Sequence, residues 1–184
     1  MNKIENNIDY LKLIDSINFY QNKGYMYKHI PWLVEENISN ITKPQNRNNF
    51  YVRDKVLVAS AEQSFITLLK NQDVGLGYYI GLSPCFRDED DINNLHNNYF
   101  MKSELFITEN VNSNNLQNVI NHALEFFNQY IKCEVIKIND LSYDIIDSKN
   151  KLELGSYGIR MHNNYMWIYG TGCAEPRLTK LINL

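Results

Sequence analysis

The fold is decided by Cys85-Phe86-Arg87-Asp88-Glu89 together with a distant downstream stretch, Gly170-Thr171-Gly172-Cys173-Ala174-Glu175-Pro176-Arg177. In the first stretch an arginine stands beside carboxylates at the end of an apolar segment. In the second, we expect a glycine turn that opens a helix carrying another arginine. Guanidinium groups bind phosphate oxygens bidentately, and the free N–H groups of a helix start attract anions. The two stretches therefore predict a triphosphate-binding site with reaction at the α-phosphorus.

The orientation of Arg87 follows from strand alternation. If Phe86 points into the core, Arg87 lies on the opposite face of the strand, and Glu89 shares that face. An ion-paired strand end is the competing interpretation of this Arg-x-Glu pattern. For the downstream stretch, the alternative is an ordinary glycine turn followed by a solvated Arg177.

Composition argues against several classes of function. The net charge of −3 and the lack of a Lys/Arg run argue against a dedicated nucleic-acid surface. Three cysteines without close spacing predict neither a disulfide framework nor a cysteine-based zinc site. No stretch approaches the roughly 20 apolar residues that span a bilayer, and the N-terminus lacks an apolar signal region. We expect a cytoplasmic protein with no membrane segment.

The pattern of apolar residues predicts the elements of an α+β fold. Amphipathic helices are expected at residues 8–20, 61–69 and 115–131. Short strands are expected around residues 25–29, 56–59, 78–82, 100–108, 133–138, 143–146, 152–161 and 165–169. Residues 35–49 are expected to form a polar loop. Consecutive short strands with tight turns indicate an antiparallel sheet flanked by helices, in a single domain over residues 1–184.

The first stretch, extended through the strand Tyr99-Phe100-Met101-Lys102-Ser103-Glu104, resembles the second signature motif of class II aminoacyl-tRNA synthetases. The resemblance implies that Arg87 holds the α-phosphate of ATP and the carboxylate of an amino acid. It places Glu89 on the adenine side and Phe100 against the adenine ring, where an aromatic face can stack. His96, in the loop between the two strands, would contact the γ-phosphate or the end of the acceptor.

The downstream stretch resembles the third signature motif of the same family. By this resemblance Gly170 and Gly172 let the backbone approach the nucleotide, and Arg177 contacts the γ-phosphate and closes over the adenine opposite Phe100. Glu175-Pro176 departs from the small or apolar residues that are common before the family's arginine. The departure implies a different geometry of the chain just before Arg177.

Residues 151–162, Lys-Leu-Glu-Leu-Gly-Ser-Tyr-Gly-Ile-Arg-Met-His, resemble most closely a strand pair of the aspartyl- and asparaginyl-tRNA synthetases and ammonia-dependent asparagine synthetase. The match implies that Glu153 is a ligand of the Mg²⁺ bound to ATP, with Asp144 as its partner. Carboxylate oxygens suit this hard cation. Arg160 would meet the side chain of an acidic or amide amino acid, whereas a cross-strand ion pair is the alternative.

Three further residues are candidates for holding the amino acid. Glu62, in Ser60-Ala61-Glu62, resembles the Thr/Ser-x-Glu element that binds the α-amino group in several class II enzymes. Stabilisation of the first helical turn is the alternative for Glu62. Lys102 and Glu104 alternate along their strand, so both can face one pocket.

The whole resemblance implies ATP-dependent activation of an amino acid to an aminoacyl-adenylate. Residues 23–31 resemble the family's first motif, which implies a homodimer formed through the N-terminal helix and strand. No anticodon-binding domain fits in 184 residues, so the acceptor stays open between RNA, a carrier protein, ammonia and a small amine. The alternatives are a catalytically inactive paralogue used for dimerisation or regulation, and a plain nucleotide-binding module. Glu62 and Arg160 lining one pocket would favour the enzyme.

Overall fold

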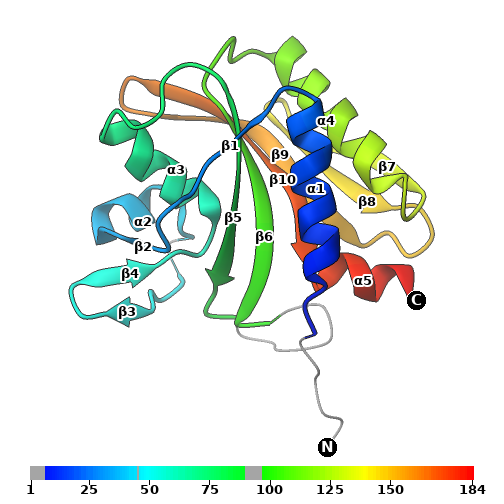
Figure 1. Ribbon diagram of the computed structural model, residues 1–184, viewed down its shortest axis with the longest axis horizontal. Helices are drawn as coiled ribbons and strands as arrows, with labels where there is room; N and C mark the ends of the chain where they lie inside the picture. Colours follow the sequence, from blue (N-terminus) through cyan, green and yellow to red (C-terminus); the bar gives the residue numbers. More distant parts are fainter. Residues whose placement is uncertain (1–6, 45, 90–96) are drawn as a thin grey trace, which may run out of the picture.

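The computed structural model describes residues 7–44, 46–89 and 97–184, and a large twisted sheet organises them (Figure 1). Within these residues seven strands pair in the order β1-β5-β6-β10-β9-β8-β7. They are β1 (Met26–Tyr27), β5 (Tyr78–Phe86), β6 (Tyr99–Ile107), β7 (Cys133–Asn139), β8 (Ser142–Asp147), β9 (Glu153–His162) and β10 (Tyr165–Glu175). Every pairing is antiparallel except that of β1 with β5. The predicted α+β fold, an antiparallel sheet flanked by helices, is confirmed.

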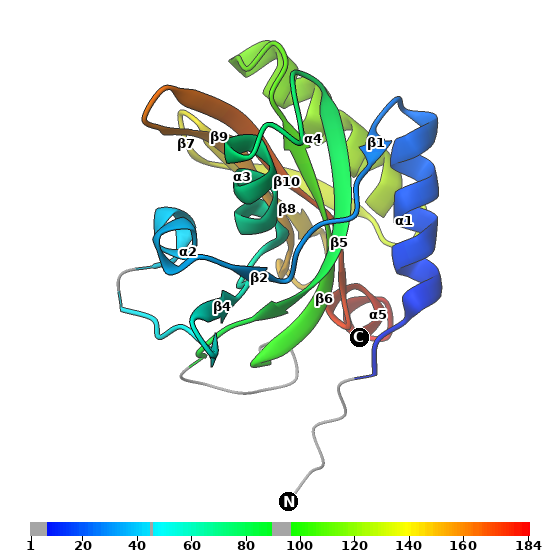
Figure 2. The same ribbon diagram turned by 60° about the vertical axis from the view of Figure 1, so that its left-hand side comes forward.

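Two amphipathic helices, α1 (Tyr10–Asn22) and α4 (Ser113–Phe127), cover one face of this sheet (Figure 2). The α4 helix begins at Asn112, whose side chain accepts a hydrogen bond from the Asn115 backbone N–H. Its apolar stripe, which includes Leu116 and Ile120, is fully buried against the sheet. Across the described parts of the chain, no helix is long and apolar enough to cross a membrane.

The opposite face is covered by α3 (Ala61–Lys70), with α2 (Glu36–Thr42) beyond it. Phe65 of α3 stacks on Phe106 of β6 with ring centroids 5.0 Å apart, and Phe106 lies against Trp167 of β10. A small sheet, ordered β2 (Leu33–Val34), β4 (Lys55–Leu57) and β3 (Tyr51–Val52), borders these helices. The stacked rings of Phe65, Phe106 and Trp167 form an aromatic layer that holds α3 against the central strands β6 and β10.

Two local predictions are wrong. The segment expected as a polar loop contains α2, because Ile38 is buried against the second core. The expected glycine turn is part of β10, and α5 (Arg177–Ile182) begins only after Pro176. A Cβ at Gly170 would lie 2.7 Å from Cδ1 of Tyr157, and one at Gly172 would lie 2.6 Å from the Ser103 Oγ. Close packing explains these glycines, and no turn is present.

Candidate functional site

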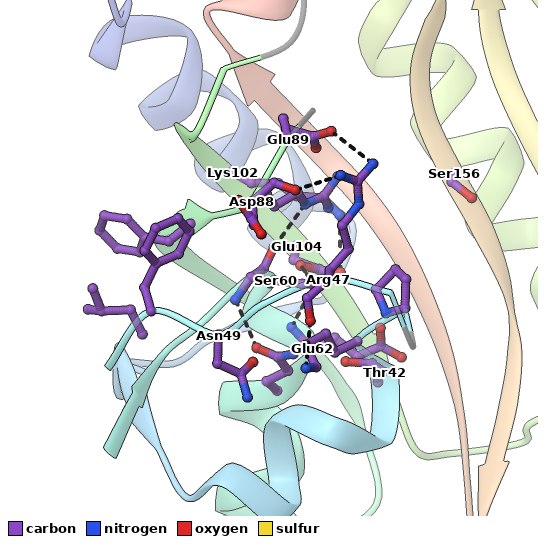
Figure 3. Close-up of a pocket in the computed structure, with 18 of the residues that line it drawn as sticks. Thr42, Arg47, Asn49, Ser60, Glu62, Asp88, Glu89, Lys102, Glu104 and Ser156 are labelled. Atoms are coloured by element: carbon purple, nitrogen blue, oxygen red, sulfur yellow. Dashed lines mark hydrogen bonds and ion pairs between the residues drawn. The ribbon is translucent and has the colours of Figure 1, made fainter. Parts of the chain in front are cut away.

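A cavity of about 400 Å³ opens on the α3 side of the sheet (Figure 3). Its walls come from the start of α3, the end of β5, the strands β6, β9 and β10, and the segment that follows α2. Seven predicted site residues line it: Glu62, Arg87, Glu89, Lys102, Glu104, Glu153 and Arg160. Residues 62 and 160 therefore share one pocket with Arg87, which was the arrangement expected of an adenylating enzyme.

Lys102 and Glu104 reach the cavity because they are two residues apart on β6 and so share a face. Glu104 is buried, and its Oε1 lies 3.1 Å from the Lys102 Nζ. Its Oε2 accepts a hydrogen bond of 2.6 Å from the Ser60 Oγ. Thr171 lies opposite Glu104 on the neighbouring strand β10 and also lines the cavity. The floor is thus a polar layer whose charges are paired within the protein.

Arg87 follows the last residue of β5 and is held from two directions. Its backbone N–H donates to the Asn98 carbonyl at 2.8 Å, and its Nε donates to the Ala59 carbonyl at 3.2 Å. The guanidinium lies over the Phe100 ring, 4.9 Å from the centroid. These contacts fix the position of the guanidinium before any ligand binds.

A second, smaller cavity of about 20 Å³ adjoins the first. It shares Arg87 and Glu89 with the main cavity, and Phe100 and Arg177 also line it. Arg177 donates from Nη1 to the Glu153 Oε1 at 3.2 Å. A space of this size holds about one water molecule, so a purine ring fits only if the lining residues move apart.

Glu62 is the most deeply buried carboxylate of the main cavity apart from Glu104. Its Oε1 accepts a 2.6 Å hydrogen bond from the Trp167 Nε1, and its Oε2 is ion-paired with Arg160. The Arg160 guanidinium also lies 4.2 Å from the centroid of the Tyr169 ring. Burial raises the pKa of Glu62 to about 7, against the opposing effects of Arg160 and Trp167. Arg160 is thus ion-paired, but its partner, Glu62, lies on α3 and not on a neighbouring strand.

Asp144 and Glu153 lie near each other on β8 and β9. Burial raises the pKa of Asp144, and the negative charge of Glu153 raises it further. Both carboxylates offer the oxygen donors that Mg²⁺ takes, but only Glu153 lines the main cavity, and it is paired with Arg177. Among the described residues no group of three or more acidic, histidine or cysteine side chains could hold a metal, so water and phosphate oxygens would complete the coordination.

The remaining predicted residues lie elsewhere. Gly170 and Gly172 pack toward Tyr157 and Ser103 and line neither cavity. Asp144 is not part of the cavity wall either, although Ser156, its partner across the strand pair, is. His96 lies outside the described residues.

Gln63 and Arg47 are among the side chains of the main cavity that sequence reasoning missed. Gln63 accepts a hydrogen bond from the Ala59 backbone N–H at 2.8 Å and donates to the Ser39 carbonyl at 3.0 Å, which joins α3 to α2. Arg47 enters from the segment after α2. The position of Arg47 in an expected polar loop gave no signal that it belongs to a site. Gln63, an amide next to Glu62 in a first helical turn, could have suggested a polar contact.

Comparison with models of protein families and with characterised proteins gave no match. Solved structures do match. Pyrrolysyl-tRNA synthetase from Desulfitobacterium hafniense is 15% identical with a TM-score of 0.76, over 96% of this chain and 69% of that chain. Seryl-tRNA synthetase from Pyrococcus horikoshii, complexed with ATP, is 19% identical with a TM-score of 0.70, over 94% and 49%.

The cytoplasmic serine-tRNA ligase from Naegleria fowleri, in complex with AMP, is 18% identical with a TM-score of 0.66, over 91% of this chain and 46% of that chain. This chain therefore spans about half the length of the two seryl enzymes. The three matches give no support to the finer resemblance to the aspartyl and asparaginyl group. They show that this chain has the fold of the class II aminoacyl-tRNA synthetase catalytic core.

Proposed function

We propose that this protein uses ATP to activate an amino acid as an aminoacyl-adenylate, with release of pyrophosphate. The observation that carries the proposal is the position of Arg87 at the junction of two adjoining cavities. One cavity holds charged groups suited to an amino acid, and the other holds Phe100 and Arg177. Two neighbours of this fold were solved with ATP and with AMP, which supports nucleotide binding by a chain of this fold.

In this proposal the chain acts by positioning and by charge. A carboxylate oxygen of the amino acid attacks the α-phosphorus in line, and the bond from that phosphorus to the pyrophosphate oxygen breaks. Arg87, held by Ala59 and Phe100, neutralises the charge that builds up on the α-phosphate. The substrate itself supplies the nucleophile, so alignment of the two substrates accounts for most of the acceleration.

Arg177 and Phe100 would enclose the adenine, and Arg177 would also reach the γ-phosphate. The ion pair between Arg177 and Glu153 at 3.2 Å must then open. Glu153, with Asp144 behind it, would hold Mg²⁺. The cation supplies Lewis-acid neutralisation of the phosphate oxygens when it is bound.

The deep end of the main cavity would hold the amino acid. Glu62 and Glu104 offer hydrogen-bond acceptors to an ammonium group, since each carboxylate oxygen has a second lone pair besides the one already used. Arg160 and Lys102 offer positive charge nearby. The finer resemblance to the aspartyl and asparaginyl group favours an acidic or amide side chain facing Arg160.

The acceptor of the activated amino acid would be RNA or a carrier protein. The protein would act in the cytoplasm, where ATP and amino acids are both abundant. The protein would act as a homodimer through α1 and β1. Met26 of β1 is partly exposed, as the first-motif surface of such a dimer requires. Size-exclusion chromatography with light scattering tests the dimer.

The test of the proposed function is exchange of labelled pyrophosphate into ATP, measured with each of the twenty amino acids. We expect exchange with one amino acid or one chemical class, loss of exchange in Arg87→Ala, and normal exchange in Arg53→Ala. Arg53 is an exposed arginine in the turn between β3 and β4, outside both cavities. ATP binding without exchange for any amino acid would contradict the proposal and favour an inactive paralogue.

A further inference from the structure

Trp167 belongs to the aromatic layer beneath α3, yet its indole ring carries one polar group. The residue lies on β10 directly opposite Arg160 of β9, so the two side chains share one face of the sheet. Both donate to Glu62: the Trp167 Nε1–H to Oε1 at 2.6 Å, and the Arg160 Nη1 to Oε2. One cross-strand pair thus holds both oxygens of a single carboxylate.

The packing of the aromatic layer fixes the direction of the Trp167 N–H. The residue is 1% exposed, and its ring stacks on that of Phe106 with the centroids 5.9 Å apart. A buried N–H needs an acceptor, and here the acceptor is a carboxylate that lines the main cavity. Trp167 itself is not part of the cavity wall. The layer behind the cavity therefore determines where the oxygens of Glu62 lie.

The charge of Glu62 depends on the groups around it. The titratable groups that face it come from three strands: Lys102 and Glu104 of β6, Arg160 of β9 and Tyr169 of β10. Burial is the largest effect and raises the pKa of Glu62 to about 7, and Glu104 acts in the same direction. Arg160, the N–H of Trp167 and Lys102 lower the pKa. Each of these donors and cations thus favours the ionised carboxylate at neutral pH.

We propose that Trp167 is a positioning residue for the amino acid substrate, because its N–H holds the Glu62 carboxylate in the orientation that accepts the ammonium group. The inference rests on the proposed function, in which Glu62 binds that group. Trp167 acts through Glu62 from behind the cavity wall. A tryptophan that served packing alone would affect stability and leave the affinity for the amino acid unchanged.

The experiment uses Trp167→Phe, which keeps an aromatic ring against Phe106 and removes the N–H. Exchange of labelled pyrophosphate into ATP is measured with each of the twenty amino acids, and KM is determined for those that the wild type uses. The KM for the amino acid should rise about tenfold, the effect of losing one charge-assisted hydrogen bond, while the KM for ATP stays unchanged.

Tyr79→Phe is the matched control. Tyr79 belongs to the same buried cluster as Trp167, and its hydroxyl donates to the Gly75 carbonyl at 3.2 Å. The substitution therefore also removes one donor from this core and keeps the ring, but it leaves Glu62 untouched. Neither KM should change in Tyr79→Phe.

The pH dependence separates positioning from packing. Without the N–H the pKa of Glu62 should rise further, so the KM for the amino acid in Trp167→Phe should increase toward low pH from a point about one pH unit higher than in the wild type. The same displacement should appear without any substrate in urea denaturation, where the fall in stability with rising pH should extend to higher pH. Tyr79→Phe should keep the pH profile of the wild type.

An unchanged KM for the amino acid and an unchanged pH profile in Trp167→Phe would overturn the inference. Equal losses of affinity for the amino acid and for ATP would overturn it too, because they would indicate a general disturbance of the site. In both cases the wild type still exchanges pyrophosphate, so the proposed function stands. A wild type that exchanges pyrophosphate with no amino acid overturns the proposed function, and the inference that rests on it falls as well.

Discussion

Replacing Glu62 with glutamine should change how the stability of the protein depends on pH. The side chain of Glu62 is 3% exposed and accepts hydrogen bonds from Trp167 and Arg160. Glutamine has the same shape and, like a protonated carboxyl group, carries no charge. The variant therefore reports on the free-energy cost of ionising this buried group.

The sign follows from proton binding in the two states. In the unfolded chain Glu62 loses its proton near its ordinary pKa of 4.5, whereas burial in the folded protein raises the pKa to about 7. Between these values the folded state binds more protons than the unfolded state, so the free energy of unfolding falls as the pH rises. The contribution amounts to about 3 kcal/mol less stability at high pH than at low pH.

Urea denaturation of the wild type and Glu62→Gln, from about pH 4 to about pH 8, measures this effect. The stability of the wild type should fall relative to the variant as the pH rises through this range. Glu125→Gln is the control, since Glu125 is an exposed carboxylate paired with Lys23, and its profile should follow that of the wild type. A wild type that gains stability over Glu62→Gln with rising pH would refute the reasoning, because Arg160 would then outweigh burial.

Three further substitutions test the packing and the site. Gly170→Ala should cost about 1–3 kcal/mol in urea denaturation, because the added methyl group meets Tyr157 at 2.7 Å, and an unchanged midpoint would contradict this packing. Phe65→Ala should cost about 3–5 kcal/mol, since Phe65 is fully buried and stacks on Phe106. A loss below about 1 kcal/mol would show that the aromatic layer contributes little. Arg177→Ala should change stability by less than about 1 kcal/mol but weaken ATP binding about tenfold in calorimetry, and unchanged affinity would remove Arg177 from the site.

The polar floor of the site could be predicted from sequence because local periodicity determines it. Lys102 and Glu104 share a face of β6 through the two-residue repeat of a strand. Their ion pair also joins two residues of the same strand, so it involves no contact between distant parts of the sequence. Residues on neighbouring turns or alternate strand positions are therefore accessible to reasoning from the sequence.

The glycines and the extra helix could not be predicted in the same way. Gly170 was interpreted through the conformational freedom of glycine, but its requirement comes from the Tyr157 ring on the adjacent strand. The α2 helix contains Asn, Ser and Thr, which have weak helix propensity, and tertiary burial of Ile38 overrides that preference. In both cases the deciding contact lies outside the local sequence.

Contacts between residues that are far apart in the sequence could not be predicted either. Trp167 and Glu62 are 105 residues apart, and neither carries a local signal that names the other. Arg47 likewise meets Asp88 only after α2 and the small sheet have brought its segment to the end of β5. The sequence thus indicated the charged groups of the site better than it indicated which of them pair.

The most direct measurement is a crystal structure of the protein with a non-hydrolysable ATP analogue and Mg²⁺. Our account predicts the α-phosphate against Arg87, the adenine between Phe100 and Arg177, and Arg177 separated from Glu153. A nucleotide bound on any other surface, or the same ion pair still closed beside a bound nucleotide, would contradict the claim that the two cavities form one ATP site.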